Sequence, residues 1–412
     1  MKLNKLGGSL LLRIVVAIIL GILVSLFAPV WLGRIFATIN GLFGNFLNFF
    51  IPVLIFALVA PAIAGLGRGA GKWLGLTVGL AWGSTVFAGL IAYGVAQFSY
   101  PALLRGQVLD TNVSDIEEGA LEPYFTVEMP APFEVMTALL LSFCIGVAMT
   151  QVKSDNLYRI TRELEAVVTK VIWGFIIPLL PIYIFGMFLN LGMNGNLSDI
   201  LAAFAKVLIL SVVMTILYLI VQYMVAGAIA GRNPFKALKT MLPAYFTALG
   251  TASSAASIPV TLEASVKNGT SREVSGFVIP LCSVIHISGS MIKLMLYAFA
   301  IIYLTGMDVS FGKAMGFMFL LTIMMIAAPG VPGGAVMVAS GLLADMMGFD
   351  DSMVALMIAA YIAVDSAGTA ANVTGDGALA MIVDRLTNGR KDAAKAEAVH
   401  DNADAGEQIR RG

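Results

Sequence analysis

The most constraining feature of this chain is a row of polar side chains inside an apolar segment, residues 357–383, near its C-terminal end. Asp365, Thr369, Asn372 and Asp376 stand at i, i+4, i+7 and i+11, so a helix would place all four on one face. A carboxylate at the centre of a bilayer costs about 2.5 kcal/mol or more. A polar seam between helices is the simplest explanation. Two acids with an amide between them instead favour a site for a cation and a solute.

The composition places this segment in a membrane protein. Hydrophobic residues make up 59% of the 412 residues and charged residues 12%, whereas a soluble domain carries about 25% charge. We predict an all-α polytopic protein with room for about eight spans. A net charge of zero argues against a nucleic-acid partner. Cys144 and Cys282 lie in apolar segments and predict neither a disulfide framework nor a metal site, and His286 and His400 are too few for a multi-histidine site.

Apolar stretches recur along the whole chain. The first, residues 10–30, exceeds the core of a signal peptide (about 7–15 residues) and has no convincing cleavage site, so we interpret it as a retained transmembrane helix. Seven more spans are expected at residues 36–64, 74–98, 131–151, 160–192, 197–230, 272–304 and 350–384. Two further segments, residues 234–265 and 314–347, are interrupted by small residues and prolines.

Charged loops predict an orientation. Residues 101–130 form an acidic insertion in which Arg105 is the single basic residue. If the spans alternate across the membrane, most loop lysines and arginines fall on one side, and Arg34, Arg105 and Lys313 on the other. The positive-inside rule then places both termini in the cytoplasm and the acidic loop outside. We expect a multi-pass protein of the cell membrane (the cytoplasmic or inner membrane). The polar tail, residues 386–412, is predicted to be disordered.

The two interrupted segments predict hairpins that enter the membrane and leave on the same side. Their apolar limbs are about 12–16 residues long, which is too short for a span of about 20. Proline and glycine at each tip free backbone groups that lipid cannot satisfy. Two kinked full-length helices are the alternative. Two opposed hairpins, each followed by a helix that carries a row of polar residues, indicate an inverted repeat with a solute site at its middle.

These features together resemble the dicarboxylate/amino acid:cation symporter family, which has the sodium-coupled glutamate/aspartate transporter fold. The resemblance rests on four motifs in order: Ser253-Ser-Ala-Ala-Ser-Ile-Pro-Val-Thr261, Ile279-Pro-Leu281, Gly330-Val-Pro-Gly-Gly334 and Asn372-Val-Thr-Gly-Asp376. It implies eight transmembrane helices, two re-entrant hairpins and a homotrimer. Residues 1–73 and 131–192 would form the scaffold and trimerisation helices. Residues 74–98 and 193–385 would form a transport domain that moves like an elevator, with the second hairpin as its gate.

The resemblance also implies roles for individual residues. Its substrate-binding candidates are Asp365 for an amino group, Asn372 for a carboxylate, Thr369 beside them, and at the hairpin tips Ser253, Ser254, Val331 and Gly334. Lys293 is a further substrate-binding candidate that the resemblance does not supply. Its cation-binding candidates are Asp376, which matches a sodium ligand, with Asn372, Cys282, His286 and Ser288. Hard cations prefer carboxylate and carbonyl oxygens. Broken helix ends offer free N–H groups to anions and free C=O groups to cations.

This sequence departs from the family pattern at two places. Members that carry acidic amino acids have an arginine on the eighth helix, where this chain has Gly368. On the seventh helix the family motif Asn-Met-Asp-Gly-Thr is replaced by His286-Ile-Ser-Gly-Ser290, which removes a carboxylate ligand of one sodium site. The two changes argue against strict glutamate/aspartate specificity and against coupling to three sodium ions.

A lysine in mid-span is the other unusual feature of the seventh helix. The polar residues on its expected common face are Ser283, His286, Ser290 and Lys293. Lys293 should need a carboxylate partner, either Asp365 or Asp376. It would bind a substrate carboxylate in place of the charge missing at Gly368, or form a static ion pair that replaces a sodium ion, or lie at a water-filled rim.

Histidine is the residue type best suited to proton coupling near neutral pH, and His286 lies in an apolar segment. We predict that protons replace one or more sodium ions in transport; a neutral core histidine is the alternative. The predicted function is secondary active symport, driven by sodium ions, protons or both, with no other cofactor. A small neutral amino acid such as serine, threonine or alanine is the first substrate choice, and a dicarboxylate held by Lys293 is the second.

Three other functions are compatible with a polytopic membrane protein. An intramembrane enzyme is disfavoured because the chain has no nucleophile motif and no paired catalytic acids on two separate helices. A receptor is disfavoured because the chain has no sizeable soluble domain. A channel of the same architecture stays open, and saturable, gradient-dependent uptake would distinguish a carrier from it.

Overall fold

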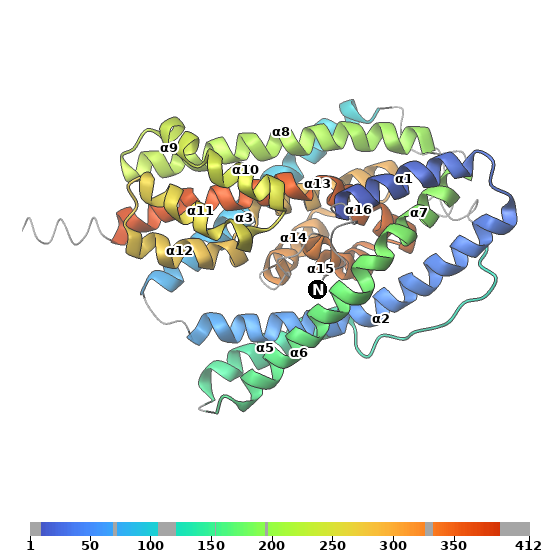
Figure 1. The fold of residues 1–412 in the computed structure, drawn as a ribbon, viewed down its shortest axis with the longest axis horizontal. Helices are drawn as coiled ribbons and strands as arrows, with labels where there is room; N and C mark the ends of the chain where they lie inside the picture. Colours follow the sequence, from blue (N-terminus) through green and yellow to red (C-terminus); the bar gives the residue numbers. More distant parts are fainter. Residues whose placement is uncertain are drawn as a thin grey trace, which may run out of the picture.

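The computed structural model describes residues 10–68, 72–105, 121–152, 154–193, 197–325 and 333–387. Within these ranges the chain is helical and has no strand (Figure 1), which confirms the all-α prediction. The helices in the first half are α1 Leu10–Ser25, α2 Val30–Arg68, α3 Lys72–Leu103, α5 Val135–Gln151, α6 Asn156–Val171, η1 Ile172–Ile176, α7 Ile177–Met193 and α8 Leu197–Ala230. Those in the second half are α9 Pro234–Thr240, α10 Leu242–Thr251, α11 Ser254–Lys267, α12 Arg272–Ile285, α13 Ser288–Leu304, α14 Phe311–Met325, α15 Gly334–Leu342, η2 Leu343–Met347, α16 Asp351–Ala363 and a last helix, Asp365–Thr387.

The expected apolar stretches coincide with these helices to within a few residues. In the described part of the chain, five helices are long and apolar enough to cross a membrane: Val30–Gly65, Leu74–Leu103, Asn156–Met193, Leu201–Ala230 and Arg272–Leu304. A sixth span results if α16 and the last helix, which are bent by 60° relative to each other, are taken together. Helices α1, α5, α14 and the α15–η2 pair are apolar but shorter. The figure of eight transmembrane helices stays a prediction.

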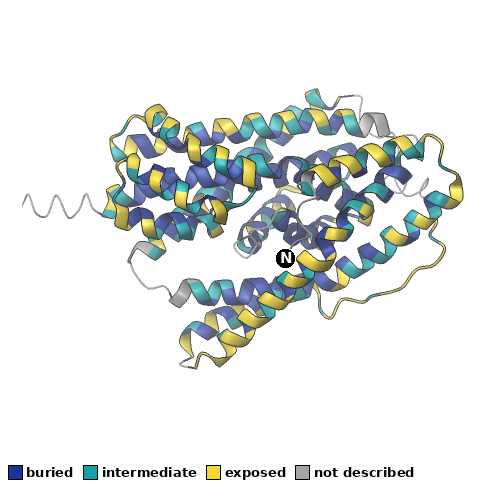
Figure 2. Cartoon of the chain, viewed as in Figure 1, coloured by how far each residue is buried: buried dark blue, intermediate teal, exposed yellow. Residues whose placement is uncertain are grey.

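The helices pack in two groups. Helix α2 packs against α5, α6 and α7, and α1 packs against α7. Helices α3 and α8 pack against α13, while α9 to α12 and the last helix lie together at the left of Figure 1. The buried residues concentrate on α13 and α16, and the outer faces of α6 and α8 are exposed (Figure 2). Many exposed side chains there are large and apolar, including Ile160, Ile209 and Val225, as expected for contact with lipid.

The same order of elements occurs twice in the second half of the chain. Helices α10 and α11 pack against each other on either side of Ala252, whose φ of 48° turns the backbone. They are followed by α12 and α13, which are separated by a break at His286 and Ile287. Helices α14 and α15 also pack against each other. They are followed by α16 and the last helix, which are separated by a break at Val364. The second tip, residues 326–332, lies outside the described residues.

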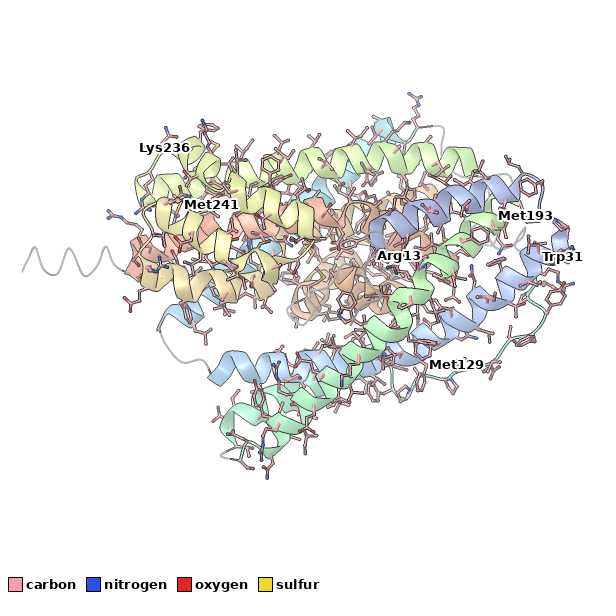
Figure 3. The ribbon with its side chains drawn as sticks, viewed as in Figure 1. Arg13, Trp31, Met129, Met193, Lys236 and Met241 are labelled. Atoms are coloured by element: carbon pink, nitrogen blue, oxygen red, sulfur yellow. The ribbon has the colours of Figure 1, made fainter. Side chains whose placement is uncertain are left out.

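The described part of the acidic insertion lies beside α2. Lys236 lies at one end and Trp31 at the other (Figure 3). The described part of the acidic insertion, residues 121–130, runs beside α2, where the Arg34 guanidinium lies 4.6 Å from the Tyr124 ring centroid. The rest of the predicted acidic loop and the predicted disordered tail lie mainly outside the described residues, so both stay predictions.

Candidate functional site

The seventh span is broken in its middle, which the sequence did not predict. Helix α12 ends at Ile285, His286 has an extended backbone (φ −101°, ψ 106°), and α13 begins at Ser288. The N–H of Ile287 points to the Thr85 hydroxyl of α3, at 3.4 Å. Breaking a helix exposes backbone groups that need partners inside a membrane. The break therefore marks a place where polar side chains from neighbouring helices gather.

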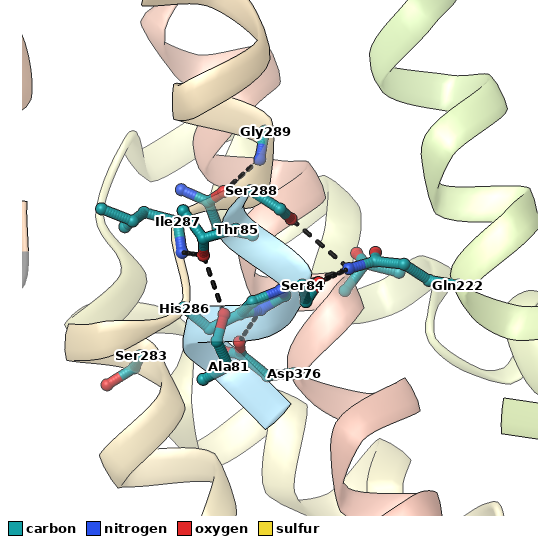
Figure 4. Close-up of polar contacts among 12 residues, drawn as sticks. Ala81, Ser84, Thr85, Gln222, Ser283, His286, Ile287, Ser288, Gly289 and Asp376 are labelled. Carbon is teal, nitrogen blue, oxygen red and sulfur yellow. Dashed lines mark hydrogen bonds and ion pairs between the residues drawn. The ribbon is translucent and has the colours of Figure 1, made fainter. Parts of the chain in front are cut away.

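The break also corrects the predicted common face of this span. Ser283 lies before the break and points away from the polar cluster (Figure 4), and its hydroxyl donates to the Pro280 carbonyl at 2.7 Å. Assigning Ser283 to the same face as Lys293 was wrong, because helical spacing holds only within an unbroken helix. Ser290 and Lys293 lie beyond the break, on α13, and both are buried.

Asn372 of the last helix holds the start of α13. Its Oδ1 accepts the N–H groups of Gly289 at 2.8 Å and Ser290 at 3.3 Å, and its Nδ2 donates to the Ser290 hydroxyl at 3.0 Å. A Cβ atom at Gly289 would lie 2.7 Å from the Gly368 carbonyl oxygen, so the two helices touch at their glycines. Thr369 is buried beside them and donates to the Asp365 carbonyl in its own helix at 3.0 Å.

Asp376 pairs with His286 at the break (Figure 4). Its Oδ1 lies 2.9 Å from the His286 Nδ1, and the imidazole Nε2 lies 3.1 Å from both the Gln222 amide nitrogen and the Ser84 hydroxyl. Because an amide nitrogen can only donate, Nε2 is the acceptor and Nδ1 carries the proton that Asp376 accepts. The Gln222 amide also points to the Ser288 hydroxyl at 3.4 Å. The alternative of a hydrogen-bonded core histidine thus fits this geometry.

Lys293 pairs with Asp365, one of the two partners expected from the sequence. Its ammonium lies 3.4 Å from the Asp365 Oδ1, and only 1% of the residue is exposed. The alternative that this lysine lies at a water-filled rim was therefore wrong. The other Asp365 oxygen, Oδ2, accepts the N–H of Gly333 at 2.8 Å, at the start of α15. Gly333 directly follows the segment predicted to form the second hairpin tip, so a main-chain amide from this part of the chain contacts Asp365.

The other predicted residues are placed as follows. Ser253 caps α11 by accepting the Ala256 N–H at 3.3 Å, and it also bonds to its near neighbours Thr251 and Ser257. Ser254 begins α11 and is half-buried. Gly334 begins α15 and is buried, whereas Val331 lies outside the described residues. Cys282 is buried on α12, where its carbonyl accepts the His286 N–H at 2.8 Å.

Besides Thr85, three side chains at the site were not singled out from the sequence. Ser84 and Gln222 come from α3 and α8, and Tyr361 of α16 lies with its ring centroid 4.1 Å from the Lys293 ammonium. Gln222 could have been recognised from the sequence as a site candidate, because an amide in the middle of an apolar stretch needs a partner inside a membrane protein. Ser84 and Tyr361 are common residue types in such helices and gave no signal.

Residues 10–386 match the sodium:dicarboxylate symporter family. The chain belongs to this family. It is therefore a multi-pass membrane symporter of small molecules in a family that couples transport to sodium, and not a member of an enzyme family.

In this member of the sodium:dicarboxylate symporter family, the Asp376 carboxylate is the candidate group for holding a cation as cargo. No three histidine, cysteine, aspartate or glutamate residues converge to bind a metal within the described ranges. The Asp376 Oδ2 is buried and accepts no hydrogen bond there, so a carboxylate oxygen is left for a cation. Sodium accepts such oxygen ligands together with carbonyl groups, which a helix break supplies.

Proposed function

We propose that this protein imports a small carboxylate-bearing solute, an amino acid or a dicarboxylate, by symport with sodium ions, protons or both. The observation that carries the proposal is the meeting of two broken spans. The break between α12 and α13 faces the last helix. Of the four polar residues in a row on that helix, Asp365, Asn372 and Asp376 contact groups at or beyond the break. Buried polar groups on opposed broken helices are the usual setting of solute and ion sites in transporters.

The architecture supports an elevator mechanism. The twice-repeated order of a helix pair and a broken span is what an inverted repeat with two re-entrant hairpins would produce. Residues 1–73 and 131–192 would form the scaffold of a homotrimer in the inner membrane, with both termini in the cytoplasm. Residues 74–98 and 193–385 would form the moving transport domain. In this assignment the hydrogen bond from Gly333 to Asp365 links the second hairpin, the gate, to the substrate site.

Uptake into liposomes tests the function directly. We expect the purified protein to accumulate at least one of four radiolabelled solutes (succinate, aspartate, alanine and serine) when sodium is high outside, and not when choline replaces sodium. Uptake should saturate, because a carrier binds its solute in each cycle. Flux that rises linearly with solute concentration and ignores the sodium gradient would instead indicate a channel and overturn the proposal.

Proton coupling is tested by adding a pH gradient at fixed sodium. If His286 takes part in coupling, an acidic exterior should increase the initial uptake rate relative to equal pH on both sides. Replacing His286 by glutamine, which keeps one donor and one acceptor, should remove that increase while leaving sodium dependence. Uptake by the unmodified protein that does not respond to the gradient would remove protons from the mechanism and assign His286 a structural role.

A further inference from the structure

The ammonium group of Lys293 has an acceptor for each of its hydrogens. Its nitrogen lies 3.1 Å from the Val364 carbonyl, 3.2 Å from the Asp365 carbonyl and 3.4 Å from the Asp365 Oδ1. The ring of Tyr361 covers it, with the centroid 4.1 Å from the nitrogen. An ammonium has three N–H donors. Lys293 is thus fully bonded inside the protein, at the break of the last span, and has no donor left for a substrate carboxylate.

Asp365 is equally occupied. Oδ1 faces Lys293, and Oδ2 accepts the Gly333 N–H at 2.8 Å. The second carboxylate of the site, Asp376, faces the imidazole of His286 at 2.9 Å. Each acid of the site thus has a nitrogen partner that belongs to the protein. A solute that carries an amino group would meet an Asp365 whose charge Lys293 already neutralises, while the open carboxylate oxygen of Asp376, Oδ2, lies at the candidate cation site.

Gly368 provides the space that the ammonium occupies. A Cβ atom built at this position would overlap both the Cε and the Nζ atoms of Lys293. Its backbone has no left-handed φ, so the conformation does not require glycine. The absence of a side chain at Gly368 therefore serves the fit of Lys293 against the last helix. The last helix, Gly368 and the Lys293 side chain thus pack together so that the Lys293 ammonium fills the space beside Asp365, and no ligand amine is needed there.

We propose that Lys293 is a tethered amine, that is, an ammonium group of the protein that takes the place of a ligand's amino group. It neutralises Asp365 and makes the site select carboxylates that lack an amino group. Through Asp365 it also fixes the Gly333 end of α15. This inference rests on the proposed function, since it names the substrate class of the same site. It favours an amine-free acid over the small neutral amino acid that the sequence suggested first. The fixed α15 would not depend on a ligand amine for its position.

Chemical rescue tests the tethered amine without knowledge of the substrate. Replacing Lys293 by alanine removes three carbons and the nitrogen, which is the size of propylammonium. We expect Lys293→Ala to lower the thermal unfolding midpoint of the full-length protein in detergent. Propylammonium chloride should then restore several degrees more than choline chloride at the same concentration. The unmodified protein and Lys293→Met, which fills the space without charge, should show no such difference.

A matched control separates this effect from general loss of charge. Lys313 is exposed at the start of α14, and Lys313→Met should neither shift the midpoint appreciably nor respond to propylammonium. If Lys293→Ala shows no extra stabilisation by propylammonium, or if Lys293→Met and the unmodified protein show the same stabilisation, Lys293 is not acting as a tethered amine.

Selectivity is tested with two ligand pairs that differ in one amino group, succinate against aspartate and propionate against alanine, each at saturating sodium. The unmodified protein should bind the amine-free member of at least one pair about tenfold more tightly or better. Lys293→Ala should lose or reverse that preference. An unmodified protein that shows no preference in either pair, or prefers the amines, would overturn the inference. Failure of sodium-driven uptake for every solute would instead overturn the proposed function, and the rescue result would stand apart from it.

Discussion

Replacing Asp376 by asparagine is expected to abolish sodium-dependent behaviour while leaving the protein folded. Asparagine keeps the oxygen that accepts from His286, so the contact at 2.9 Å can persist. It loses the negative charge, and its amide nitrogen takes the place of an oxygen that is buried without a partner in the described structure. Removing one charge from a buried charged contact costs about 2–5 kcal/mol. Sodium affinity should therefore fall by about 30-fold or more.

The measurement is the rise of the unfolding midpoint with sodium chloride over choline chloride, followed by sodium-driven uptake. A ligand that binds the folded state raises this midpoint by mass action. Asp308→Asn is the matched control, because Asp308 is exposed in the loop after α13; this variant should keep the sodium response. If Asp376→Asn responds to sodium like the unmodified protein, the cation site lies elsewhere.

Much of the fold was predictable because a membrane restricts the possible elements. A span must be apolar over about 20 residues, so the hydropathy of the chain located the helices from residue 10 to residue 387 closely. The partner of Lys293 was predictable for a related reason. A lysine far from either end of a span cannot leave its charge unpaired, and Asp365 and Asp376 were the available carboxylates. The structure selects Asp365.

The breaks in the spans were not predictable from local sequence. Neither His286 nor Val364 is a proline or a glycine, and both lie in apolar stretches that read as continuous helices. The break at His286 is supported by groups distant in sequence: the Thr85 hydroxyl reaches the Ile287 N–H, and Asn372 holds the first amides of α13. Such partners exist only once the helices have packed, so a single sequence does not indicate them.

The site residues that could be predicted are those that depend on local sequence, and the ones that could not be predicted depend on how the helices pack. The stripe from Asp365 to Asp376 was found because helical periodicity is a local property, and the unbroken last helix preserves it. Ser283 was misplaced because the same periodicity was applied across a break. The contributions of Ser84 and Gln222 depend on how α3 and α8 lie against α12 and α13, which hydropathy does not determine.

Adding one methyl group at Gly368 is expected to be among the most damaging small substitutions in this protein. The Cβ of Gly368→Ala would overlap the end of the Lys293 side chain, which is held between Val364, Asp365 and the Tyr361 ring and cannot move without losing those contacts. Overpacking of a buried site costs about 1–3 kcal/mol. The thermal unfolding midpoint should fall, and the preference for amine-free acids should weaken with it.

A double substitution shows whether Lys293 is the cause. In Lys293→Ala the space beside Gly368 is already open, so adding Gly368→Ala should cost little further stability, and the two changes should be strongly non-additive.

Gly276→Ala is the matched control: a Cβ at Gly276 meets no atom within 4 Å, so this helix glycine should tolerate alanine or gain slightly from it. If Gly368→Ala costs the same stability in the unmodified protein and in Lys293→Ala, Gly368 is needed for the contact between α13 and the last helix and not for the lysine. The non-additive result would show that the missing side chain at Gly368 on the last helix makes room for the buried Lys293 ammonium on α13.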